Sequence, residues 1–189
     1  LAIPAEVRYH VQRMPVSQGK LTLGYRTNTA YRDDDYAALL FYNGVLGGFP
    51  HSKLFQNIRE KASLAYYTFS RLEKHKGIQL IGSGIEVENH ERVMEIIMEQ
   101  VKSIKKGEIS AEEMENTRRA LINQFKIVAD NPYSMLNLNL DGLLGGKDEG
   151  LDYYLRKLAE IEVDDVVAVA DKVYLDTIYF LRAGEEVKA

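Results

Sequence analysis

Cysteine is absent from the 189 residues of this chain, and signals of several other protein classes are missing as well. Without cysteine, neither a disulfide framework nor a thiolate metal site can form, which fits a cytoplasmic protein. Basic residues are not in excess, because 24 Lys and Arg stand against 28 Asp and Glu, for a formal net charge of -4. No apolar run approaches the length of a membrane span. We therefore expect neither nucleic acid nor a lipid bilayer as a partner.

Motifs of nucleophilic and phosphate-binding enzymes are also missing. The chain has no Gly-x-Ser-x-Gly elbow and no Gly-x-x-x-x-Gly-Lys loop. Gly47-Gly48, ahead of a helix, could cradle an anion, but a plain turn explains the pair better. The carboxylates of Asp33, Asp34 and Asp35 could bind a hard cation, although the EF-hand spacing is missing and a solvated turn accounts for them equally well. The four histidines are scattered, and we expect exposed loop or cap residues at His10, His51, His75 and His90.

The size and composition are those of one globular domain. Hydrophobic residues make up 46% of the chain and charged residues 28%, so a sizeable core can form. The sequence opens Leu1-Ala2-Ile3-Pro4, without an initiator methionine and without a signal segment. We therefore expect residues 1–189 to be a single domain excised from a longer polypeptide.

Hydrophobic periodicity predicts an α+β fold. Alternating apolar residues favour strands at 7–11, 21–25, 65–72, 78–87 and 177–181. Helical spacing, with Ser52 and Asn89 as N-caps and a capping box of Ser110 and Glu113, favours helices at 36–46, 52–64, 89–107, 110–131, 135–144, 150–159 and 164–174. Strands followed by amphipathic helices indicate a largely antiparallel sheet with helices packed on one face.

The stretch from Gly47 to Ser70 carries the most information. It contains a glycine turn, a short helix and a strand that begins near Ala65. Helical spacing places Arg59 at the flank of the apolar face of the helix, and Tyr66 opens the strand. An arginine and a tyrosine thus stand where a helix gives way to a strand.

This stretch resembles the second domain of pitrilysin-type (insulinase-type) zinc metallopeptidases, the family of mitochondrial processing peptidase. The resemblance rests on Leu54-Phe55, on Ile58-Arg59-Glu60-Lys61 and on Leu64-Ala65-Tyr66, with Leu46-Gly47-Gly48 before them. It implies a C-terminal domain without zinc that encloses peptide and faces a zinc site on another domain or subunit. The family's zinc motif, His-x-x-Glu-His, does not occur in this chain, so the zinc would belong to the partner half.

By the same resemblance, Arg59 and Tyr66 are the candidate catalytic residues. A guanidinium and a phenol can donate hydrogen bonds to the carbonyl oxygen of a bound peptide as it gains negative charge. The alternative is that Arg59 pairs with an exposed acid such as Glu60 or Glu73 while Tyr66 packs at the start of the strand.

We therefore expect the non-zinc half of a bacterial, cytoplasmic peptidase, with no cofactor in this chain. Its partners would be a zinc-bearing half and a peptide substrate, and the parent protein could be a catalytically silent subunit. The alternative function is a non-enzymatic peptide-binding or structural module. In that case the strand with Gly82 and Gly84, or the wall of the chamber, would hold an extended peptide by strand addition.

Overall fold

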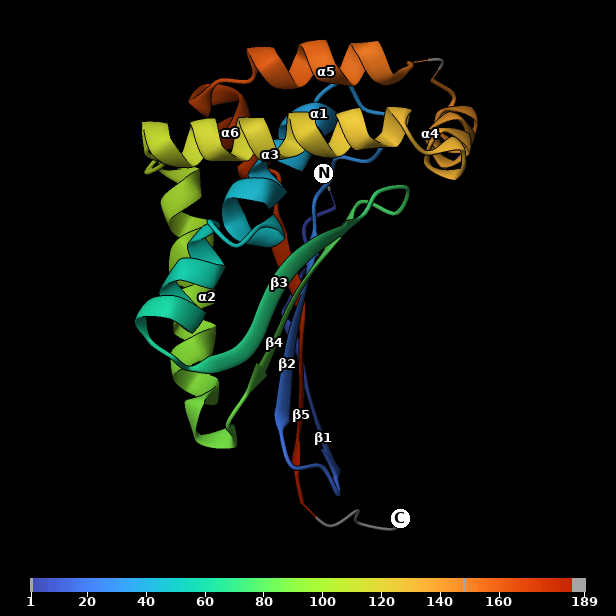
Figure 1. The fold of residues 1–189 in the computed structure, drawn as a ribbon. Helices are drawn as coiled ribbons and strands as arrows, with labels where there is room; N and C mark the ends of the chain where they lie inside the picture. The colour runs from blue at the N-terminus through green and yellow to red at the C-terminus, as the bar shows by residue number, and fades with distance from the viewer. Residues whose placement is uncertain (1, 148, 185–189) are drawn as a thin grey trace.

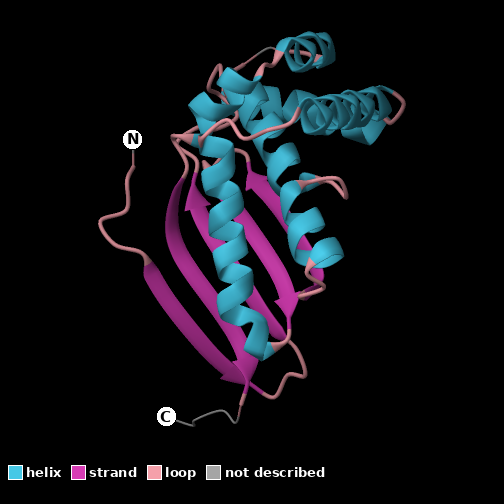
Figure 2. Cartoon of the chain, turned by 90° about the vertical axis from the view of Figure 1, so that its left-hand side faces the viewer, coloured by secondary structure: helices cyan, strands magenta, loops and turns pink. Residues whose placement is uncertain are grey.

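The computed structural model describes residues 2–147 and 149–184, and Leu1 lies outside the described part. A single sheet forms one layer, and helices form a second layer along one of its faces and across one of its ends (Figure 1). Figure 2 shows the long helices lying over that face, and Figure 1 shows that, among the described residues, no helix lies on the other face. The α+β architecture expected from the sequence is confirmed.

Five strands form the sheet in the order β1-β5-β2-β4-β3. All neighbouring pairs are antiparallel except β1 and β5, which are parallel. The C-terminal strand therefore lies between the first two strands of the chain. The strands are β1 (Arg8–Met14), β2 (Gly19–Arg26), β3 (Ala65–Glu73), β4 (Ile78–Ile85) and β5 (Tyr174–Ala183).

The helical layer combines regular helices with shorter π and 3-10 segments. The α-helices are α1 (Tyr36–Asn43), α2 (His90–Lys105), α3 (Ala111–Ala129), α4 (Pro132–Gly145), α5 (Leu151–Glu160) and α6 (Val163–Ala170). The shorter segments are η1 (Gly44–Gly48) and η2 (Phe55–Lys61), both π-helical, and the 3-10 turn η3 (Val87–Asn89). Among the described residues, no helix has the length and apolar character needed to cross a membrane.

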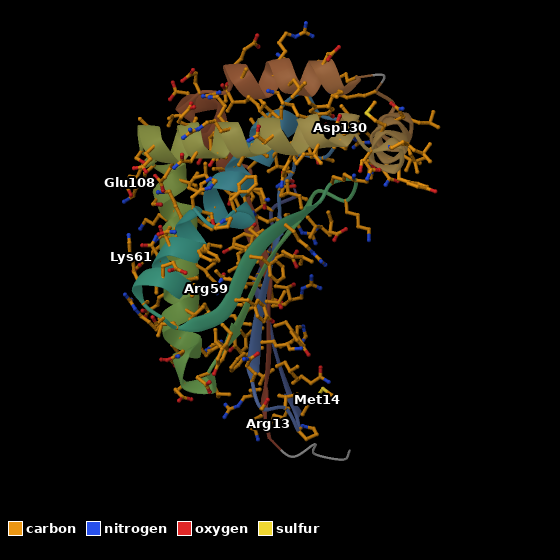
Figure 3. All side chains as sticks on the ribbon, in the orientation of Figure 1. Arg13, Met14, Arg59, Lys61, Glu108 and Asp130 are labelled. Atoms are coloured by element: carbon orange, nitrogen blue, oxygen red, sulfur yellow. The ribbon has the colours of Figure 1, made fainter. Side chains whose placement is uncertain are left out.

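Strand side chains alternate between the buried core and an open face. On β2, Leu21, Leu23 and Tyr25 are buried under the helices, whereas Lys20 and Arg26 are exposed on the other side. Figure 3 shows the same alternation at the lower end of β1, where Arg13 and Met14 point to opposite sides of the sheet. Because no helix in the described part of the chain covers the second side, we call it the open face.

Most helix boundaries follow the local signals. Ser110 and Glu113 form the expected capping box at the start of α3. The side chain of Asn131 accepts a hydrogen bond from the Ser134 amide, and α4 therefore starts already at Pro132. The helix expected over 164–174 ends at Ala170, because Tyr174 already belongs to β5.

Three of the expected local roles are wrong. The Ser52 hydroxyl is buried without a hydrogen-bond partner, so it does not cap a helix, and the side chain of Asn89 caps none either. Gly47-Gly48 is not a turn with positive φ but the end of η1. A Cβ on Gly47 would lie 2.8 Å from Cβ of Ser70, so the glycine is needed where η1 approaches β3.

Candidate functional site

The candidate site is built on η2 and the start of β3. Leu54 and Ile58 are fully buried and attach this segment to the core. The Leu64 amide then donates to the Ile58 carbonyl at 2.9 Å, which closes the segment before β3 begins. A π-helix places its side chains at a different angle from an α-helix, so helical periodicity in the sequence could not give the orientation of Arg59.

A buried lysine fixes the beginning of the segment to the start of α3. The ammonium of Lys53 donates to the Glu108 carbonyl at 2.8 Å and lies 2.9 Å from Oε1 of Glu113. Burial alone would raise the pKa of Glu113, but the Ser110 amide and the Lys53 ammonium outweigh it and leave this pKa lowered. Glu113 therefore stays ionised at neutral pH, and its contact with Lys53 holds η2 in place.

Arg59 is exposed on η2. Its guanidinium lies over the ring of Phe55, 4.7 Å from the centroid, a cation-π contact one helical turn back. In Figure 3, Arg59 lies on the side of η2 near β3, whereas Lys61 points outward. Within residues 2–147 and 149–184 no ion pair of Arg59 with Glu60 is present, and Glu73 instead pairs with Arg71 at 3.7 Å. The guanidinium therefore keeps donors that are available to a ligand.

Tyr66 is the irregular residue of β3. The pairing of β3 with β4 shifts between Ala65 and Tyr67, which leaves Tyr66 in a bulge with 54% of its surface exposed. Its phenol donates a hydrogen bond to the carboxylate of Glu86, directly after β4. The alternative interpretation of the sequence had Tyr66 packing at the start of the strand. Its exposure and its hydrogen bond to Glu86 do not agree with that interpretation. Glu86 was not among the sequence-predicted residues, although a hairpin over residues 65–85 places it opposite this point.

The open face beside Tyr66 carries two aromatic rings. Tyr67 and Phe69 stack with centroids 6.2 Å apart and lie across Gly84 and Gly82 of β4. These glycines provide space for the two rings and do not mark a place for an added backbone. Because β4 is paired with β2 on one side and β3 on the other, it has no free edge, so strand addition at β4 is excluded.

No metal centre is formed by the described residues: they contain no group of three or more His, Asp or Glu side chains suited to a metal ion. His75 binds Asp141 at 2.9 Å and His90 binds the Tyr9 hydroxyl at 2.9 Å. His51 stacks on the Phe49 ring and is half-buried, so it is not the exposed loop residue that was expected.

The aspartates of the 33–35 turn also have internal roles. Asp33 accepts a hydrogen bond from the Ala30 amide, and Asp35 forms an ion pair with Lys172. Asp34 lies 3.0 Å from the ammonium of Lys147. Protein groups therefore account for all three carboxylates, and no bound metal ion is needed to explain them.

Comparison with known protein families shows to which family this chain belongs. The sequence model of the family described as "Peptidase M16 inactive domain" matches residues 2–121. The chain belongs to the M16 peptidase family, as an inactive domain. The pitrilysin-type resemblance of the stretch around Arg59 and Tyr66 is thereby confirmed.

Three relatives of this M16 domain come from bacteria. A Bacillus subtilis protein described as "Probable inactive metalloprotease YmfF" is 40% identical over 182 residues, 96% of this chain and 42% of its own length. Another from the same organism, described as "Uncharacterized zinc protease YmxG", is 25% identical over 175 residues, 89% of this chain and 42% of its own. The structure of a conserved protein from Enterococcus faecalis superposes with a TM-score of 0.91 at 32% identity, over 100% of this chain and 44% of that chain. The M16 domain thus spans less than half the length of these relatives.

Proposed function

We propose that this M16 domain encloses peptide and supplies Arg59 and Tyr66 to a zinc site carried by another half of the peptidase. The observation that carries the proposal is that both side chains are exposed on adjoining elements, η2 and β3, in a domain whose described residues form no metal site. A guanidinium and a phenol are not the usual ligands of zinc, but both can donate hydrogen bonds to an oxygen that becomes negative during attack by zinc-bound water.

Glu86 fits this role as the local partner of Tyr66. The carboxylate accepts the phenol's hydrogen bond and so holds the Tyr66 side chain at the start of β3. In the assembled site, the substrate oxygen would replace Glu86 as the acceptor. The stacking of Arg59 on Phe55 would limit the freedom of the guanidinium in the same way, so both donors would be positioned before substrate arrives.

The partner half also has a place to dock. One face of α4 exposes Tyr133, Leu136, Leu140, Leu143 and Leu144, each with between 47% and 79% of its surface accessible. Their spacing of three and four residues forms one stripe along the helix, and such a stripe favours burial against another apolar surface. Because relatives are more than twice as long as this chain, we propose that their remaining half is what covers the α4 stripe.

The test is peptide cleavage by the domain assembled with its zinc-bearing half. We expect Arg59→Ala or Tyr66→Phe to lower kcat by about ten- to a thousand-fold, as for the loss of one preorganised donor, with little change in KM. Lys61→Ala, on the outer side of η2, and Tyr67→Phe, next to Tyr66, are the matched controls and should leave kcat unchanged. Unchanged turnover in both test variants would reduce Arg59 and Tyr66 to surface residues.

A second candidate function is a peptide-holding half within a protein that cuts nothing. The observation in its favour is the name of the Bacillus subtilis relative, "Probable inactive metalloprotease". The two candidates differ in the assembled protein. One zinc per assembly together with cleavage of peptides supports the first, whereas bound peptide without zinc and without cleavage supports the second.

A further inference from the structure

A cavity of about 700 Å³ lies at the upper end of the open face. Three segments far apart in the sequence form it: the 26–33 connection after β2, the turn between β3 and β4, and the end of α4, which meet beside the N-terminal segment (Figure 1). Its volume is within the range of small-ligand sites, which run from about 300 to 1,000 Å³. Neither Arg59 nor Tyr66 lines it, so it is separate from the site described above.

The backbone around the cavity is firmly connected. The Thr27 amide donates to the Gly77 carbonyl at 2.9 Å, and the Tyr31 amide donates to the Lys74 carbonyl at 2.8 Å. These bonds tie the turn of the β3–β4 hairpin to the 26–33 connection. Gly77, with φ of +61°, permits the tight turn. The cavity is therefore formed before any ligand arrives.

The charge of its lining is opposite to that of the whole chain. Arg26, Arg32 and Lys76 line the cavity, against one carboxylate, that of Asp33. Within residues 2–147 and 149–184, neither Arg32 nor Lys76 takes part in an ion pair, while Arg26 shares Asp176 with Arg8. In a chain with a net charge of -4, a cavity with uncompensated cations concentrates positive potential and attracts anions.

The lining can recognise a carboxylate through its side-chain cations. Phosphate sites are usually built from free backbone amides, but here the amides of Thr27, Ala30 and Tyr31 donate to internal acceptors. The side-chain cations are then the main donors for an anion, and a guanidinium fork matches a carboxylate, as it does a phosphate, in shape. Tyr31 and Ile78 add apolar walls that suit the carbon atoms beside a carboxylate group.

We propose that this cavity binds a carboxylate of a peptide that lies across the open face. Arg26 and Ile78 belong both to the open face and to the cavity, so the two surfaces are continuous. The inference rests on the proposed function for the presence of a peptide at Tyr66, beside which the open face begins. It adds the path of that peptide across the open face and a substrate class: peptides with an acidic group at the end that reaches the cavity.

The test uses two labelled decapeptides that differ only in charge. One ends in Asp-Asp with a free carboxylate, and its twin ends in Asn-Asn-amide. Fluorescence anisotropy with the purified protein should give at least about tenfold tighter binding of the acidic peptide, the size expected for charge-assisted hydrogen bonds. Arg32→Gln or Lys76→Gln should lower this preference by about threefold or more. The control is Lys20→Gln, at the far end of β2 on the same face, which should preserve it.

Three results would overturn the proposal. The first is equal binding, or no binding, of the two peptides at about millimolar concentration. The second is a loss in Lys20→Gln as large as in Arg32→Gln, because the attraction would then be a diffuse surface effect. The third is inorganic phosphate that binds with dependence on Arg32 and Lys76 while the twins do not differ, which would make the cavity a small-anion site.

The outcome is separable from that of the proposed function. Binding of the decapeptides needs no zinc half, and Arg59→Ala should leave the preference for the acidic twin unchanged. If turnover depends on Arg59 but the two decapeptides bind equally, the proposed carboxylate binding in the cavity is refuted and the proposed function is not. The acidic preference without any effect of Arg59→Ala on turnover would refute the proposed function alone.

Discussion

Replacing Gly82 by alanine tests how the open face is packed. A methyl group there would lie 2.5 Å from Cζ and 2.6 Å from Cε1 of Phe69, whereas ordinary contacts begin near 3.4 Å. The ring must therefore move by about 1 Å or swing into solvent, which costs about 1–3 kcal/mol. Replacing glycine by alanine also lowers the conformational entropy of the unfolded chain, which stabilises the folded state by about 0.5–1 kcal/mol. We expect a net loss of about 1–2 kcal/mol in the free energy of unfolding, or about 3–6 °C in Tm for a chain of this size.

Gly24 provides the matched control on the same face of the same sheet. A methyl group at Gly24 would meet nothing closer than 3.8 Å, at the Thr177 carbonyl oxygen. Gly24→Ala should therefore leave stability unchanged or raise it by about 0.5 kcal/mol. Urea unfolding of both variants measures the difference. If Gly82→Ala is as stable as Gly24→Ala, the argument that the β4 glycines accommodate the aromatic rings is refuted. Adding Phe69→Leu to Gly82→Ala should restore part of the loss, because the obstructing ring is gone.

Two further predictions concern docking and acid stability. Leu136→Asp and Leu143→Asp, each as a single change, should abolish association of the domain with its zinc-bearing half in sedimentation experiments. The control Asn139→Asp adds the same single charge outside the stripe and should not. Association that survives in both leucine variants would refute α4 as the docking face. The Thr177 hydroxyl and then the guanidinium groups of Arg8 and Arg26 hold the pKa of Asp176 below its ordinary value of 3.8. Its stabilising contribution is therefore complete above about pH 4 and is lost as the pH falls through the lower folded-state pKa. Asp176→Asn should lose less Tm between pH 5 and pH 3 than the parent protein, and an identical pH dependence would contradict this assignment.

The sequence predicted well those features that depend on neighbouring residues. Two helix starts were predictable because a cap depends on residues only three positions apart. They are the capping box of Ser110 and Glu113 and the Asn131-Pro132 boundary. The strands were predictable because one side of the sheet is buried, so apolar residues recur at every second position along each strand. The position of β5 between β1 and β2 depends on long-range pairing, and no local pattern in the sequence specifies it.

The candidate site was predictable in part. Arg59 and Tyr66 were found through a family motif, and their exposure agrees with a role at a surface. Their surroundings were not predictable. The π-helical turn of η2 leaves no periodic signature, and the bulge at Tyr66 appears only when β3 pairs with β4. The meaning of Gly82 and Gly84 was missed for the same reason, because the rings that require them come from the neighbouring strand.

The place of β5 in the sheet has a consequence for biosynthesis. Until Tyr174–Ala183 has left the ribosome, β1 has no neighbour and β2 presents an unpaired edge. An exposed edge of this kind invites pairing with other nascent chains. A product truncated before Tyr174 would therefore lose two strands from its sheet rather than one. We expect such a product to accumulate in inclusion bodies even though most of its hydrophobic residues have been synthesised.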